Sequence, residues 1–202
     1  MDMIIHRPRT RLSPEKRKQQ LLEIGIDVFA RRGIGRGGHA DIAEIAHVSV
    51  ATVFNYFPTR EGLVEAILNE VEQHFTTFLE RNIDLTLPVK HNLQTLSQQL
   101  IETVLNETQW IKIWFEWSTS TREDVWPLFV ATHTKHQHNF RTLFANAIVQ
   151  GELNDRHHPS NIAKLFHGIC YSIFVQANRR PDRDYLNHLA SSFIEMLCIY
   201  KD

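Results

Sequence analysis

The sequence predicts an all-α fold in which a small N-terminal helical domain is joined to a larger helical one. Apolar residues recur at helical spacing along most of the 202 residues, and no segment alternates with the period of two that marks a strand. Prolines stand at the joints between these segments, at Pro88, Pro159 and Pro181. A chain of this length and 43% hydrophobic content is an ordinary globular composition with enough apolar side chains for a core.

The first helix is expected to begin at Pro14. Ser13 is a hydroxyl N-cap, Pro14 suits the first helical position, and Glu15 faces the positive end of the helix dipole. One buried face carries Leu21, Leu22, Gly25, Val28 and Phe29, and Gly33 ends the helix. The following GIGRGG, 33–38, is interpreted as a flexible connector rather than a phosphate loop, because it follows a helix and lacks the GK[ST] ending.

The stretch HADIAEIAHVSVATVFNYFP has the spacing of a helix-turn-helix, over about 38–57. Ile42, Ala43, Ile45 and Ala46 give a first short helix, and Ser49 caps a second that stops at Phe57 before Pro58. Ala43 supplies the small contact, while Val53 is expected to reach a shared core with Ile42, Ile45 and Val48. His47 occupies the turn, where histidine tolerates positive φ. The alternative is a helical hairpin buried in a core.

Six further helices complete the expected fold. Thr59 caps a long one that keeps an apolar stripe to about residue 82, formed by Val64, Ile67, Leu68, Val71, Phe75, Phe78 and Leu79. The others are expected near 89–105, 108–118, 122–150, 160–179 and 184–200. The expected divisions are a basic arm at 1–12, a helix-turn-helix domain at 13–60 and a helical domain at 61–202.

Charge is distributed unevenly along a chain with a formal net charge of −1. Residues 1–60 hold ten Lys or Arg against six Asp or Glu, whereas 61–202 hold twelve against seventeen. A basic head of this kind is typical of a module that binds nucleic acid, although a solvated tail has the same charge. With neither a signal peptide nor a long apolar run, and with two cysteines outside any CxxC pair, we expect a cytoplasmic protein without a membrane segment.

The second short helix would present its first turn and the face of Asn55 to the major groove of double-stranded DNA. Val50 and Ala51 offer contact to thymine methyls, Thr52 reaches a base edge or phosphate, and Asn55 pairs with adenine. The side chains expected beside the phosphates are those of His39, Ser49, Tyr56, Thr59 and Arg60.

Residues 13–64 resemble the DNA-binding domain of the TetR family of bacterial transcription regulators, with VSVATVFNYFPTREGL matching its signature. Many members have glycine in place of His47 and tyrosine in place of Phe54, and phenylalanine cannot donate a hydrogen bond to DNA. RPRTRLSPEKRKQQ, WFEWSTSTREDVWPLF and LFHGICYSIFVQANR further resemble quorum-sensing master regulators of Vibrio and relatives, the LuxR/HapR/LitR type. This resemblance implies a homodimer that activates some promoters and represses others at high cell density; the alternative is a ligand-responsive local repressor.

The same resemblance implies that the last two helices form the dimer interface, as a four-helix bundle. Their apolar residues at helical spacing are Leu165, Ile169, Ile173, Leu186, Leu189, Phe193 and Leu197, which an intrachain core would also explain. An aromatic stripe at Trp110, Trp114 and Trp117 is first of all a core feature. It is also expected to help line a pocket for a small apolar ligand, whose proposed wall is Phe75, Phe78, Leu79, Leu96, Leu100, Trp114, Phe129, His133, Gln137, Phe140, Phe166 and Cys170.

The RPRTR segment precedes the Ser13 cap, and Pro8 biases it toward an extended shape. An extended arginine arm suits a narrow A·T-rich minor groove, so Arg9 and Arg11 are expected to insert there and Arg7 to contact a phosphate. A solvated tail is the alternative. Such a regulator would bind a pseudo-palindromic operator as a homodimer.

Other functional classes have weaker support. His133, His136 and His138 do not share a helix face, and His167 with Cys170 lacks further ligands nearby, so we expect no metal. No cofactor motif is evident. An enzyme with Cys170 as nucleophile and His167 as base lacks an orienting residue or oxyanion donor, and we expect the protein not to be an enzyme. A nonspecific nucleoid-type protein would bind all duplexes equally.

Overall fold

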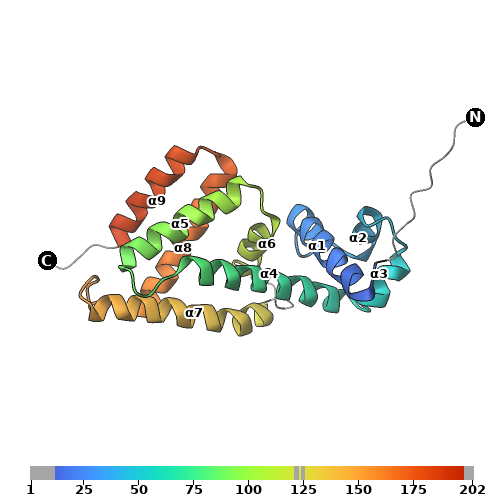
Figure 1. Cartoon of the computed structure of the whole chain (residues 1–202), viewed down its shortest axis with the longest axis horizontal. Coiled ribbons are helices and arrows are strands. Elements are labelled where there is room, and N and C mark those ends of the chain that lie inside the picture. Colours follow the sequence, from blue (N-terminus) through green and yellow to red (C-terminus); the bar gives the residue numbers. More distant parts are fainter. Residues whose placement is uncertain (1–11, 121–122, 124–125, 198–202) are drawn as a thin grey trace, which may run out of the picture. The chain divides into compact units, whose positions relative to one another are not determined.

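A computed structural model describes residues 12–120, 123 and 126–197, and within these ranges the chain is helical with no strand (Figure 1). The helices are α1 (Pro14–Arg32), α2 (His39–Ile45), α3 (Val50–Tyr56), α4 (Arg60–Asn82), α5 (Val89–Leu105), α6 (Gln109–Ser118), α7 (Trp126–Val149), α8 (Pro159–Arg179) and α9 (Arg183–Leu197). The predicted all-α class is confirmed, and the predicted helix ends lie close to these bounds. None of the described helices is both long and apolar enough to cross a membrane.

The chain divides into two compact units, Met1–Ile67 and Leu68–Asp202, with the boundary inside α4. This division lies seven residues after the predicted boundary at residues 60 and 61. Leu63 and Ile67, both fully buried, belong to the first unit, and Ile67 packs against Gly25 of α1. The start of α4 is thus part of the core that supports the short helices.

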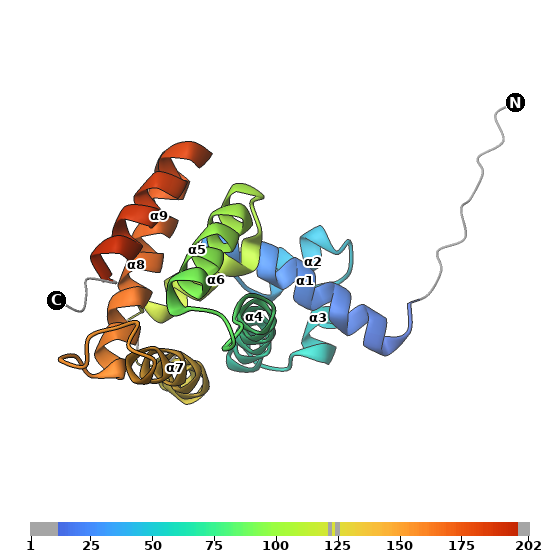
Figure 2. The ribbon, with the colours of Figure 1, turned by 60° about the vertical axis from the view of Figure 1, so that its left-hand side comes forward.

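The N-terminal unit consists of α1, α2, α3 and the start of α4 (Figure 2). The Ser13 hydroxyl accepts a hydrogen bond from the Lys16 backbone N–H at 3.3 Å, and Gly33 ends α1 with a φ of 86°. Because L-residues rarely adopt this conformation, the glycine is required there.

The connector between α1 and α2 is a packed element, not the flexible linker that the glycines predict. The backbone N–H of Gly37 donates to the carbonyl of Gly33 at 3.1 Å, and Ile34 is buried. Gly37 lies so close to the ring of Phe29 that a Cβ atom would be 2.5 Å from Cδ1. Its glycines therefore allow close approach as well as tight turning.

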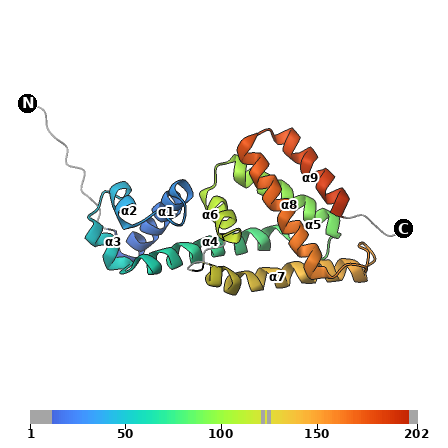
Figure 3. The ribbon, with the colours of Figure 1, turned by 180° about the vertical axis from the view of Figure 1, so that it is seen from behind.

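In the C-terminal unit, α5 packs against α8 and α9, and α8 packs against α7 as well as α9 (Figure 3). Two polar contacts reinforce the ends of these helices. The carboxylate of Glu152, just after α7, accepts a hydrogen bond from the Val89 N–H at the start of α5, and Arg183 of α9 pairs with Glu102 of α5. Satisfying an orphan N–H at a helix start is a usual role for a carboxylate.

Candidate DNA-binding site and internal cavity

The turn between α2 and α3 has the geometry that the sequence predicts. His47 adopts a φ of 51°, and the Val48 N–H donates to the Ala43 carbonyl at 3.0 Å. Ala43 and Val53 are buried where the two helices meet. Ile45, the last residue of α2, was expected in this core but is 45% exposed.

Helix α3 presents a mixed apolar and polar face to solvent. Ser49 caps it by accepting the Thr52 N–H at 3.1 Å, and its hydroxyl also bonds the Thr52 hydroxyl at 2.8 Å. Val50, Ala51 and Asn55 are exposed, as expected of residues that contact bases. A packed hairpin inside a core would have covered this face, so the structure favours the DNA-reading interpretation.

Two of the residues expected beside phosphates instead have their side chains engaged within the unit. His39 is only 6% exposed, and its Nε2 lies 2.7 Å from the carbonyl oxygen of Phe57. The Arg60 guanidinium donates to the carbonyls of Ile34, Gly35 and Gly37 at 3.1, 2.8 and 3.3 Å. Both expectations are corrected: these two side chains support the backbone of the motif.

The other residues that were expected to contact phosphates differ in how far their side chains are exposed. Tyr56 is half-buried, and the hydroxyl of the exposed Thr59 accepts the Gly62 N–H at 3.0 Å at the start of α4. The hydroxyl of Ser49 acts as the α3 cap, and can still approach a phosphate as a donor. Arg7, Arg9 and Arg11 lie outside the described residues.

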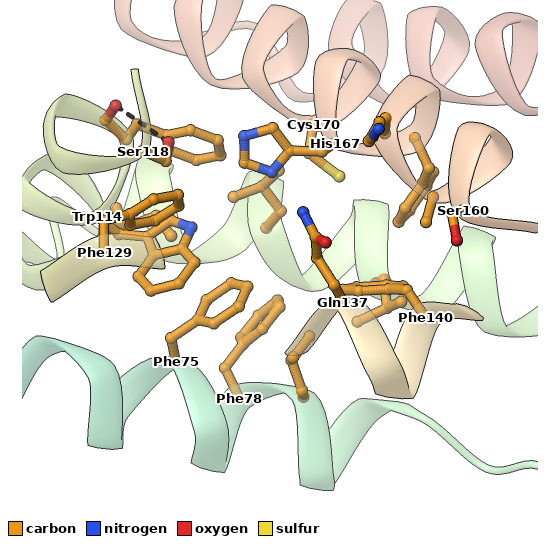
Figure 4. A pocket seen from close by; sticks show the side chains of 18 residues that line it. Phe75, Phe78, Trp114, Ser118, Phe129, Gln137, Phe140, Ser160, His167 and Cys170 are labelled. Atoms are coloured by element: carbon orange, nitrogen blue, oxygen red, sulfur yellow. Dashed lines mark hydrogen bonds between the residues drawn. The ribbon is translucent and has the colours of Figure 1, made fainter. Parts of the chain in front are cut away.

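The C-terminal unit encloses a cavity of about 240 Å³ between α4, α5, α6, α7 and α8 (Figure 4). All the residues that were predicted to form the cavity wall do so, apart from His133, whose side chain is not among those that the structure describes. Sequence reasoning missed the following wall residues: Ile111, Phe115, Ser118, Ser160, Ala163, Lys164 and His167. Four of these residues lie on α8, at helical spacing with Cys170. Because their side chains are small or polar, they do not form the apolar pattern that marks a buried face in a sequence.

Aromatic side chains form most of the cavity wall. The rings of Phe75 and Trp114 stack at 3.7 Å between centroids, and Phe129 lies 5.6 Å from Trp114. Gln137 projects into the space from α7, opposite His167 and Cys170 of α8 (Figure 4). An apolar wall with a few polar groups is typical of sites that bind small molecules.

The titratable groups of the cavity are not suited to covalent catalysis. Burial raises the pKa of the Cys170 thiol to about 12, and burial also lowers the pKa of His167. A thiol with a raised pKa is a poor nucleophile at neutral pH. Behind the wall, the fully buried His136 places Nε2 3.1 Å from the Glu72 carboxylate, which joins α7 to α4.

No group of three or more metal-binding side chains occurs among the side chains that the structure describes. His136, one of the three histidines considered for metal binding, is engaged with Glu72, and His138 lies 3.1 Å from the Arg141 guanidinium.

The residues expected at the dimer interface separate into two groups. Ile173 and Leu186 are 0% exposed, so they belong to the core of a single chain, and their assignment to the interface is corrected. Leu165 is 57% exposed, and the other residues, Ile169, Leu189, Phe193 and Leu197, are half-buried. Tyr171 and Met196, at 39% and 61%, are further exposed apolar side chains on α8 and α9.

Comparison with known proteins places the chain in a family. Residues 21–67 match the profile of the bacterial regulatory proteins of the tetR family. The HTH-type transcriptional regulator LuxR of Vibrio harveyi is 59% identical over 200 residues, which cover 99% of this chain and 98% of that protein. The nucleoid occlusion factor SlmA of Haemophilus influenzae is 28% identical over 95 residues, or 46% of this chain and 41% of that protein.

Solved structures agree on the fold. A tetR-family regulator from Rhodococcus has a TM-score of 0.77 at 18% identity, over 91% of this chain and 99% of its own. One from Agrobacterium tumefaciens has a TM-score of 0.76 at 16% identity, over 91% and 98%. With the near-complete match to LuxR, these likenesses show that the chain belongs to the tetR family of bacterial regulatory proteins.

Proposed function

We propose that this protein is a sequence-specific DNA-binding transcriptional regulator that acts as a homodimer in quorum sensing, activating some genes and repressing others at high cell density. The observation that carries the proposal is the exposed α3 face, held on a helix-turn-helix whose turn and core are fully formed. Its full-length similarity to LuxR supports the regulatory class and the assignment to quorum sensing.

Base recognition is assigned to the exposed face of α3. Val50 and Ala51 would contact thymine methyls, and Asn55 would pair with adenine. Thr52, whose hydroxyl is hydrogen-bonded to that of Ser49, would contact a base edge or a phosphate. Of these four side chains, only Thr52 and Asn55 can form hydrogen bonds to bases. The basic arm would add contacts through Arg9 and Arg11 in the minor groove.

Dimerisation is assigned to the exposed apolar side chains of α8 and α9, chiefly Leu165 and Met196 with the half-buried Phe193. A symmetric pair of recognition helices would read two inverted half-sites whose centres lie about 34 Å apart, one turn of B-DNA. Soluble monomers rarely leave such side chains grouped on a surface without a partner.

Selection of bound duplexes from a random-sequence library by the purified protein tests this function. We expect two inverted half-sites one helical turn apart, with A·T-rich flanks on either side. A chain lacking residues 1–11 should lose the flank preference while keeping the half-sites. Enrichment of no sequence would contradict the proposal, and unchanged flank preference would contradict the role of the arm.

A second proposed function is the binding of a small, largely apolar ligand in the cavity, supported by its 240 Å³ and aromatic wall. The probe is the fluorophore anilinonaphthalene sulfonate, whose emission rises in an apolar site. We expect Ala163→Phe, which fills part of the cavity, to abolish that rise, and Val149→Ser on the exposed end of α7 to leave it unchanged. Equal emission from all three proteins would contradict the assignment.

A further inference from the structure

We infer that His39 is a positioning residue for the recognition helix, setting how α3 lies in the groove and thereby how well the protein distinguishes its operator from other DNA. This inference rests on the proposed DNA-reading function. It concerns a side chain that is only 6% exposed, at the first position of α2, and therefore offers little surface to DNA.

The first contact holds the far end of α3. The carbonyl of Phe57, the C-cap residue, has no partner within the helix because it lies past the last turn. The Nε2 of His39 lies 2.7 Å from that oxygen, and because a carbonyl only accepts, His39 must carry a proton on Nε2. The bond spans 18 residues of sequence and ties the start of α2 to the end of α3.

The second contact sets the rotation of α3 about its axis. The rings of His39 and Phe54 stack with centroids 4.0 Å apart and planes within 7° of parallel. Phe54 directly precedes Asn55, and successive helical side chains are separated by about 100° around the axis. A ring held flat against His39 therefore determines the direction in which Asn55 points.

The two contacts matter because α3 has only 7 residues and is too short to be stable alone. At its start, α3 is attached through the turn, where the Val48 N–H bonds the Ala43 carbonyl. In its middle, α3 packs against α2 through Val53, which is 0% exposed. The His39 bond adds a directional contact at the far end of α3, and the stack with Phe54 resists rotation of the helix about its axis.

This arrangement also gives the aromatic ring at position 54 a role. Phe54 is 44% exposed, yet one face of its ring is covered by His39. The flat ring provides the surface against which His39 orients the helix.

Misalignment of α3 should lower the affinity for the operator more than the affinity for DNA of random sequence. Phosphate contacts supply most of the affinity for random DNA and tolerate small rotations, whereas base contacts require alignment. Loss of one aligned base contact changes discrimination by about 5- to 150-fold. Removal of a phosphate contact instead lowers the slope of log affinity against log salt by about one.

The test compares dissociation constants of the full-length protein for two duplexes: the best duplex selected by the wild type and a scrambled duplex of the same composition. We expect His39→Ala to lower the ratio of the two affinities by about 10-fold or more without changing the salt slope. His39→Gln keeps a donor at the place of Nε2 and should recover part of the ratio. His91→Ala, which removes an exposed histidine from the C-terminal unit, is the matched control and should match the wild type.

A double-mutant cycle with Phe54→Leu tests whether His39 acts through the stack. The losses of discrimination from His39→Gln and Phe54→Leu should be non-additive, because each breaks the same contact. Additive losses, an unchanged ratio for His39→Ala, or equal weakening on both duplexes with a lower salt slope would overturn the inference.

Hydrogen exchange in the absence of DNA separates this inference from the proposed function. We expect the Phe57 amide, which donates to the Val53 carbonyl at 3.0 Å, to exchange at least 10-fold faster in His39→Ala than in the wild type. Unchanged exchange would refute the anchoring role. A wild type that prefers neither duplex would refute the proposed function while leaving the exchange result meaningful.

Discussion

Substitution of Gly37 by alanine tests whether the α1–α2 connector is a packed element. A Cβ at this position would lie 2.5 Å from Cδ1 and 2.8 Å from Cε1 of Phe29, and 3.2 Å from Cγ1 of Val28. Carbon atoms pack comfortably at about 3.5–4.0 Å, so the ring or the connector must move by roughly 1 Å. Phe29 is 0% exposed, so its ring cannot move aside into solvent.

Overpacking of this kind costs about 1–3 kcal/mol, whereas replacing glycine by alanine gains about 0.4–1 kcal/mol by restricting the unfolded chain. We therefore expect Gly37→Ala to lower the free energy of unfolding by about 1–2 kcal/mol. Gly38→Ala is the matched control, because a Cβ there meets nothing within 4 Å and a φ of −162° suits any residue.

Urea unfolding at one protein concentration, followed by circular dichroism, measures the difference. The midpoint for Gly37→Ala should fall with an unchanged m-value, and Gly38→Ala should remain within about 0.5 kcal/mol of the wild type. Equal stability of the two variants would show that Phe29 does not pack against the connector.

Three further predictions concern the dimer, the cavity and the recognition helix. Leu165→Glu should weaken dimerisation at least 10-fold in sedimentation without unfolding the chain, because this side chain is 57% exposed. Val149→Glu, on the exposed end of α7, should leave dimerisation unchanged. Equal dimerisation of the two variants would exclude the α8 and α9 face as the interface. In a Cys198→Ser background, iodoacetamide should label Cys170 of the native protein at least 100-fold more slowly than Cys170 of the protein unfolded in urea. Raising the pKa from 9.0 to about 12 lowers the thiolate fraction roughly 1000-fold at neutral pH. Rapid labelling of the native protein would instead support a catalytic role for this thiol. Asn55→Ala should cost about 1–3 kcal/mol of operator binding and relax preference at one base pair, and uniform weakening on all sequences would assign it to the backbone.

Sequence reasoning succeeded where local chemistry decides the structure. Ser13 with Pro14, the histidine at the turn and the proline at 159 mark helix ends through contacts within a few residues. The aromatic wall of the cavity was predicted because large side chains at helical spacing on several helices need a common interior. Small wall residues such as Ala163 carry no comparable signal.

Sequence reasoning failed where the partner is distant in the chain. His39 and Arg60 have the hydrogen-bond donors and the sequence position of phosphate contacts, but their partners are carbonyls 18 and up to 26 residues away. Helical spacing likewise shows that Ile173 and Leu186 are covered, and only the fold shows that their own chain covers them. Tertiary neighbours, absent from any local pattern, decide such cases.

The central claim is that the exposed face of α3 reads base sequence, and the ratio of two affinities tests it most directly. The measurement compares the purified protein's dissociation constants for its selected duplex and for the same duplex with both half-sites scrambled, at physiological salt. A sequence-specific regulator should prefer the selected duplex by about 1000-fold or more. Equal affinity for the two duplexes would contradict the claim and identify a nonspecific DNA-binding protein.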